Sequence, residues 1–141
     1  MLMLTRSEHE LLTSAFIKLH AVRYKDRKKV VQLKAEGSSF EITTELLESI
    51  LIMLAMRGNE TANKQGLIKI TTNRRSLRAY QSYLKHFIFS LTTRVLPEYD
   101  RRVKIAEPAV AGRLRNYITM VKSKLTITQN LLSKVEKELN K

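Results

Sequence analysis

The sequence has no cysteine and no tryptophan, only four glycines and two prolines, and no long apolar run. The lack of cysteine excludes disulfides and cysteine-ligated zinc. The scarcity of glycine and proline leaves few sharp turns, which favours long helices over many short strands. The longest apolar run, residues 50–56, is far shorter than the about 20 residues that cross a bilayer. The first residues of the sequence do not have the pattern of a secretory signal. We therefore expect a cytoplasmic protein with no membrane association.

Motifs for catalysis are missing as well. The chain has no glycine-rich phosphate loop, no G-x-S-x-G and no H-E-x-x-H. Its three histidines are scattered, without a partner at metal-ligand spacing, and its few acids form no evident pair for acid and base catalysis. We expect no enzymatic activity, no cofactor and no metal.

Acidic residues are scarce, and the charge balance is the most informative feature of the chain. Against 26 Lys and Arg stand 13 Asp and Glu, giving a net charge of +13. Residues 61–97 hold seven Lys or Arg and no acid, and residues 23–35 hold six against one. Such a charge repels itself unless a polyanion neutralises it, and nucleic acid is the commonest such partner because bound cations release counterions from phosphate.

Composition and periodicity predict a mainly α fold. Hydrophobic residues at 43% and charged residues at 28% are typical of a folded domain. We expect four helices, a possible small β-hairpin or ribbon, and a long C-terminal helix that resembles a coiled-coil strand. Residues 1–104 would form a basic helical core and residues 105–141 the long helix, within a single domain overall.

Helix start signals place the first helix near Thr5. Thr5 and Glu8, like Ser7 and Glu10, have the spacing of a capping box, in which side chains at both ends bond to backbone N–H groups. Residues 28–43 are ambiguous. Their alternating pattern fits a β-hairpin around Gly37, and their spacing also fits an extension of the first helix. The sequence leaves both open.

The middle of the chain combines helices with one short strand. An apolar helix is expected after Thr43 and Thr44, and a short strand over residues 67–70. A strongly amphipathic helix should then start at Thr72 or Asn73. We expect Pro97 to end that helix, because proline disfavours helix at the residue before it, and residues 98–106 to form a linker.

From Pro108 onward, apolar residues follow a strict spacing of three and four. This heptad seam predicts either a coiled coil with another chain, most simply a homodimer, or a long helix that clasps the other helices. The residues predicted to form the oligomer contact are Leu114, Ile118, Val121, Leu125, Leu132, Val135 and Leu139.

The basic clusters predict a surface that docks on phosphates, with DNA favoured over RNA and no sequence specificity implied. Tyr24 and Tyr83 are candidates for stacking on bases. The residues predicted to bind nucleic acid are Arg23, Lys25, Arg27, Lys28, Lys29, Lys69, Arg74, Arg75, Arg78, Lys85, Arg101 and Arg102.

A second function also fits the sequence. The chain would then be a protein-interaction or assembly module, in which the heptad seam binds a partner helix and the positive charge meets an acidic protein.

Overall fold

The computed structural model describes residues 1–26, 30–35, 37–56 and 66–141. As the sequence predicts, the described part is mainly helical, with a long C-terminal helix and two small antiparallel sheets. Its elements, in chain order, are β1 (Leu2–Thr5), α1 (Arg6–Asp26), β2 (Val30–Ala35), β3 (Ser38–Thr43), α2 (Thr44–Ala55), β4 (Leu67–Ile70), α4 (Arg74–Ser90), the π-helix η1 (Leu91–Val95), α5 (Leu96–Ile105) and α6 (Pro108–Leu139).

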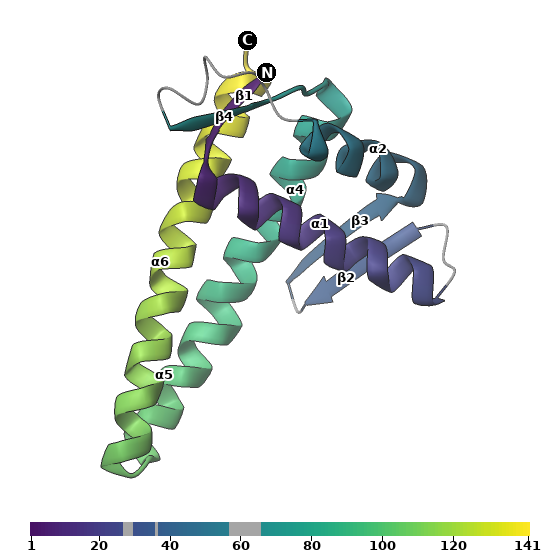
Figure 1. Ribbon diagram of the computed structural model, residues 1–141. Coiled ribbons are helices and arrows are strands. Elements are labelled where there is room, and N and C mark those ends of the chain that lie inside the picture. The colour runs from purple at the N-terminus through teal and green to yellow at the C-terminus, as the bar shows by residue number, and fades with distance from the viewer. Residues whose placement is uncertain (27–29, 36, 57–65) are drawn as a thin grey trace.

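Two long helical segments run side by side and give the molecule its elongated shape (Figure 1). α4, η1 and α5 follow one another without a break, and α6 packs back against α4 and α5. We call residues 91–124, where only this helical pair is present, the arm. The remaining described residues, in which α1, α2 and both sheets gather around α4 and the end of α6, form the head (Figure 1).

The prediction that Pro97 ends a helix and that a linker follows was wrong. The backbone stays helical at Leu91, Val95 and Leu96, and α5 continues to Ile105. A proline inside an α-helix removes one hydrogen bond and its ring clashes with the preceding turn. Here the chain widens into the π-turn just before the proline, with the N–H of Leu96 bonded to the carbonyl of Leu91, five residues earlier.

Threonines satisfy carbonyls at the same place. The Thr92 hydroxyl donates to the carbonyl of Ile88 at 2.9 Å, and the Thr93 hydroxyl donates to that of Phe89 at 2.6 Å. These carbonyls lie in the turn before the π-turn, and a π-turn ahead of a proline is one of the known ways in which a helix accommodates it. The segment therefore continues as a helix instead of ending.

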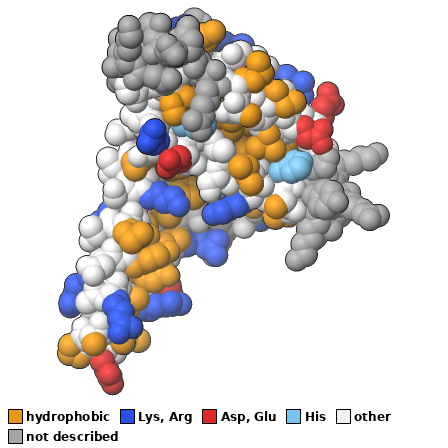
Figure 2. Space-filling view, viewed as in Figure 1, with side chains coloured by type: hydrophobic (Ala, Val, Ile, Leu, Met, Phe, Trp, Pro, Cys, Tyr) orange, Lys and Arg blue, Asp and Glu red, His pale blue; other side chains and the backbone are white. Residues whose placement is uncertain are grey.

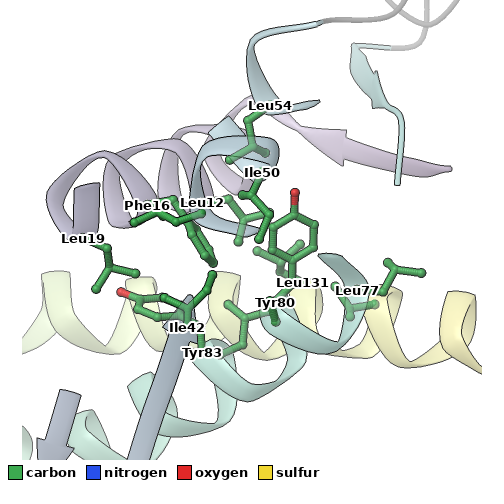
Figure 3. Packing of buried hydrophobic residues seen from close by; sticks show 14 of the residues in the cluster. Leu12, Phe16, Leu19, Ile42, Ile50, Leu54, Leu77, Tyr80, Tyr83 and Leu131 are labelled. Atoms are coloured by element: carbon green, nitrogen blue, oxygen red, sulfur yellow. The ribbon is translucent and has the colours of Figure 1, made fainter. Parts of the chain in front are cut away.

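The core of the head forms where α1 crosses α4 and α2. Phe16 is fully buried, and its ring meets those of Phe40, Tyr80 and Tyr83 at centroid distances of 5.5 to 6.5 Å. Figure 3 shows Phe16, Tyr80 and Tyr83 converging with leucines and isoleucines from α1, α2 and α6. Two of these ring contacts are edge-on and the one with Tyr83 is tilted, and such pairs add to the stabilisation from burial.

The first helix begins as the sequence predicts. The N–H of Thr5 donates to Glu8 Oε1 at 2.8 Å, and the N–H of Glu8 donates to Thr5 Oγ1 at 3.1 Å, so the capping box is confirmed. Glu8 is buried, and the ammonium of Lys134 on α6 lies 2.6 Å from its Oε1. The cap of α1 thereby also fixes α6 to the head.

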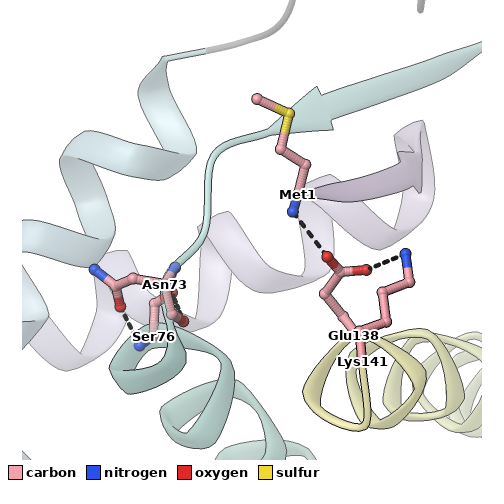
Figure 4. A network of polar contacts seen from close by, with 5 residues as sticks. All are labelled: Met1, Asn73, Ser76, Glu138 and Lys141. Atoms are coloured by element: carbon pink, nitrogen blue, oxygen red, sulfur yellow. Dashed lines mark hydrogen bonds and ion pairs between the residues drawn. The ribbon is translucent and has the colours of Figure 1, made fainter.

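The strand β4 is confirmed, and its partner β1 is an element that the sequence analysis did not predict. The two strands pair antiparallel, Leu2 opposite Ile70. Near this sheet, Asn73 caps α4 in a second capping box with Ser76 (Figure 4). The ammonium group of Met1 bonds to Glu138 at 2.9 Å, and with Lys141 it holds the pKa of that carboxyl below its ordinary value (Figure 4).

Residues 30–35 and 38–43 form the two strands of a hairpin rather than an extension of α1, whereas residues 28, 29 and 36 of the ambiguous segment lie outside the described residues. β2 and β3 pair antiparallel, Val31 opposite Ile42 and Leu33 opposite Phe40. Gly37 has a φ of +83°, a conformation that favours glycine, and a Cβ there would lie 2.8 Å from the ring of Phe89. Gly37 is thus packed directly against Phe89, near the end of α4.

The heptad seam of α6 lies against the chain's own helices. Ile118, Val121 and Val135 are buried, and Leu132 and Leu139 pack on the core of the head. Leu114 and Leu125 are half-buried. The structure therefore corresponds to the alternative in which the long helix clasps the others. A coiled coil between chains through this seam would first have to displace α4 and α5.

Candidate nucleic-acid interface

The predicted basic clusters lie at separate places in the fold. The chain from Arg23 to Lys25 belongs to the last turn of α1, but the side chains there, Tyr24 included, lie outside the described part, as do residues 27–29. In Figure 1 the end of α1 is far from the start of α4, and both are far from the tip of the arm. The structure therefore does not unite the three clusters into one surface.

The cluster on α4 is exposed and regular. Arg74, Arg78 and Lys85 are spaced by four and seven residues, so they share one stripe along the helix, and all three are exposed. The Nη1 of Arg74 donates to the carbonyl of Leu139 at 3.3 Å. Arg75 is exposed but lies about 100° around the helix from Arg74. Lys69 is half-buried and lies on β4, where it pairs opposite Met3. It therefore does not belong to the stripe on α4.

Arg101 and Arg102 are engaged locally. Both form ion pairs with Glu98 one helical turn earlier, and Arg102 also lies over the ring of Tyr99, 5.4 Å from its centroid. The charge of Glu98 offsets part of theirs. These two predicted residues are therefore weaker candidates for phosphate binding than the cations that have no acidic partner.

The structure supplies three arm cations that were not among the predicted binding residues. A groove between α5 and α6 is lined by Lys104, Arg115 and Lys122, together with Asp100. All three cations are exposed, and among the described residues none of them has a carboxylate within ion-pair distance. They come from segments 11 to 18 residues apart in the sequence that meet only because α6 folds back on α5.

The arm groove and the α4 stripe lie on the same side of the helical pair. Arg115, Lys122 and Glu136 are spaced by seven and fourteen residues, so they form one stripe along α6. Glu136 accepts a hydrogen bond from Gln81 at 3.1 Å and lies 3.9 Å from Lys85. We call this side the basic face and define it by Arg74, Arg78, Lys85, Lys104, Arg115 and Lys122.

The basic face is long and carries more cations than acids. Residues 74–104 span about 45 Å at 1.5 Å per residue. Its six cations are accompanied by Asp100 and Glu136, and only Lys85 pairs with one of these acids, at 3.9 Å. In duplex DNA about 13 base pairs cover the same length at 3.4 Å each. The face thus presents fixed positive charge along the length of about one turn of a duplex.

The other side of the arm is different in character. Tyr99 and Tyr117 stack there with ring centroids 4.5 Å apart, and Met120 is 67% exposed. Figure 2, which shows one face of the molecule, has hydrophobic side chains among the Lys and Arg side chains of the arm. Tyr83, predicted as a base-stacking residue, is only 8% exposed and packs in the core, so that prediction was wrong.

Comparisons with models of protein families, with curated proteins and with solved structures gave no match. In the described part of the chain, no helix has both the length and the hydrophobicity to cross a membrane. Within the same residues, no group of three or more potential metal ligands is found.

Proposed function

We propose that this protein binds nucleic acid without sequence specificity, duplex DNA in preference to RNA, and has no catalytic activity of its own. The observation that carries the proposal is the basic face, in which two antiparallel helices align six exposed cations over about 45 Å. Cations in such an array bind phosphates and release condensed counterions, which supplies most of the free energy of non-specific binding.

The preference for a duplex follows from what accompanies the cations. Recognition of single strands and of RNA loops relies on bases that stack on aromatic side chains. The described residues that line the arm groove include no aromatic ring, and the exposed Tyr117 belongs to the other side of the arm with Tyr99. A straight row of charge without stacking rings matches a regular phosphate backbone.

The test is binding of a labelled random-sequence DNA duplex of about 20 base pairs, followed by fluorescence anisotropy at several salt concentrations. The double variant K104Q/K122Q removes two cations of the basic face. The matched control R6Q/K34Q removes two exposed cations of the head, so the net charge changes equally. We expect K104Q/K122Q to reduce the slope of log K against log salt by about 2, and the control to leave it unchanged.

Two results would contradict the proposal. One is the absence of binding at low salt. The other is an equal decrease of the salt slope in both double variants, because binding would then depend on the total charge and not on where the cations lie. Competition by duplex RNA and by heparin tests the preference for DNA. If either competitor displaces the labelled duplex as well as unlabelled DNA of the same charge does, the protein has no preference for DNA.

A homodimer remains part of the proposal, but through a surface other than the heptad seam, which is packed against the chain's own helices, and it has its own test. Two copies would double the number of phosphate contacts and raise the affinity through effective concentration. Light scattering of the free protein decides it, since a mass near 16.3 kDa is that of one chain.

The alternative, a protein-interaction module, keeps one specific observation in its favour. The seam that was predicted to hold the partner is covered, but Val110, Tyr117 and Met120 of α6 are exposed at helical spacing beside Arg113. An acidic amphipathic helix would fit such a strip. Binding of an acidic partner that survives K104Q/K122Q and is lost in Y117S/M120S would favour this function over the first.

A further inference from the structure

An apolar cavity of about 240 Å³ opens where the head meets the arm helices. Its walls come from α1, β2 and α4, and include Leu19, Val22, Leu33 and Phe87. Val22 is 45% exposed, so the cavity reaches the surface. Concave, mostly apolar sites with a few convergent polar groups are the usual form of a small-molecule site.

The described charged groups that line the cavity are both positive. Lys18 of α1 and Lys124 of α6 are on its lining, and the lining residues that the structure describes include no carboxylate. The Nζ of Lys124 lies 5.7 Å from the centroid of the Phe87 ring. In the described part of the chain neither lysine forms an ion pair. Two unpaired ammonium groups beside an apolar wall favour a ligand with one anionic group.

Tyr83 adds a hydrogen-bond donor to the same cavity. Its ring is packed in the core, and Figure 3 shows its hydroxyl oxygen on the side of Leu19, a residue that also lines the cavity. No hydrogen-bond partner for this hydroxyl occurs among the described residues. Burial raises the pKa of Tyr83 to about 12, so the phenol keeps its proton and can donate it to an oxygen.

We propose that this cavity binds a small hydrophobic monocarboxylate, with the apolar body between Leu19, Leu33 and Phe87 and the carboxylate toward Lys18, Lys124 and the Tyr83 hydroxyl. This inference does not rest on nucleic-acid binding. Lys124 lies about 200° around α6 from Lys122, so the cavity and the basic face are on different sides of the helix.

The test is calorimetric titration of the whole protein with three eight-carbon probes and one aromatic acid. The probes are octanoate, octanol, octylammonium and naphthoate; the ionic probes are raised to about 10 mM, where a weak millimolar affinity is still measurable, and octanol to its solubility limit. We expect octanoate or naphthoate to bind about tenfold or more tighter than octanol, since charge-assisted hydrogen bonds are the strong ones. Octylammonium should not bind. Which acid binds tighter distinguishes an aliphatic from an aromatic ligand.

Variants locate the site. Y83F removes only the hydroxyl, and K124Q keeps most of the side chain, so both should fold. Each should weaken binding of the acid by several-fold and leave octanol unchanged. K34Q is the matched control, because Lys34 follows Leu33 on β2 and points to the opposite face of the strand. Thermal unfolding of each variant establishes that it is folded.

Two outcomes would overturn the inference. If no probe binds at these concentrations, the cavity is a packing gap without a ligand. If octanol binds as tightly as octanoate and K124Q changes neither, the cavity is only an apolar crevice with no preference for a carboxylate.

Discussion

The two long helical segments are covered by other elements in the head and are exposed in the arm. In the head, α4 and the end of α6 are covered by α1, α2 and the sheets, and several side chains, Phe16 and Tyr80 among them, are completely buried. In the arm, α5 has no buried residue, and Ile105 at the tip is 83% exposed. Only Leu91, Ala111, Ile118 and Val121 are buried among residues 91–124.

Charge follows the same division. Residues 91–124 hold eight Lys or Arg against three Asp or Glu, a net charge of +5 in 34 residues. A two-helix arm has too little apolar contact to be a stable unit by itself, but it exposes both of its faces. The comparison indicates that the head supplies the stability of the fold and that the arm is the part available for binding.

The largest effect that tests this division is on stability. Phe16→Ala removes a fully buried ring that contacts three other rings, so we expect a loss of about 3–5 kcal/mol in the free energy of unfolding. Leu114→Ala in the arm truncates a half-buried side chain and should cost only about 1–2 kcal/mol. Urea unfolding of both variants measures the difference, and equal losses would show that the arm is as tightly packed as the head.

A second pair of variants probes how the β2–β3 hairpin is fixed to α4. Gly37 and Gly66 both have positive φ, so Ala at either position costs about 1 kcal/mol. Only at Gly37 would the new methyl group also meet the ring of Phe89, at 2.8 Å, whereas nothing lies within 4 Å at Gly66. We expect Gly37→Ala to cost about 2–3 kcal/mol. If the two variants lose the same free energy in urea unfolding, the hairpin does not pack on Phe89.

Local signals predicted the elements that depend on local chemistry. The Thr5–Glu8 capping box and the Asn73 cap need only residues three apart, and both were read correctly. The π-turn before Pro97 was missed because a helix that widens by one residue carries no distinct signal in its residue types, and threonines at positions 92 and 93 look like those of any exposed helix. β1 was missed because three apolar residues predict a strand only once β4 is there to pair with.

The candidate site was harder to predict than the fold. Arg74, Arg78 and Lys85 share a stripe that a helical wheel shows. Lys104 and Lys122 share a groove only because α6 folds back on α5, and no spacing in the sequence encodes this. The heptad seam was recognised correctly, but its partner was not determined, because a seam has the same period whether it faces another chain or α4 of its own chain.

The smallest expected effect concerns pH and the same contact between hairpin and α4. The Nδ1 of His86 lies 3.1 Å from the Ser38 hydroxyl, and the imidazole is 8% exposed. Burial first, and then the nearby Arg94 guanidinium, lower its pKa from the ordinary value near 6.5. The neutral ring is therefore the form that the folded protein favours.

Because the unfolded chain binds this proton more readily, the contribution of His86 to stability is present above about pH 6.5 and is lost as the pH falls below it. His86→Gln has no such proton, so its free energy of unfolding should change less than that of the unaltered protein between about pH 7.5 and 5.5. Urea unfolding at both values measures this. Identical pH dependence in the two proteins would show that His86 titrates as it does in the unfolded chain and that the hairpin contact does not exclude water from the ring.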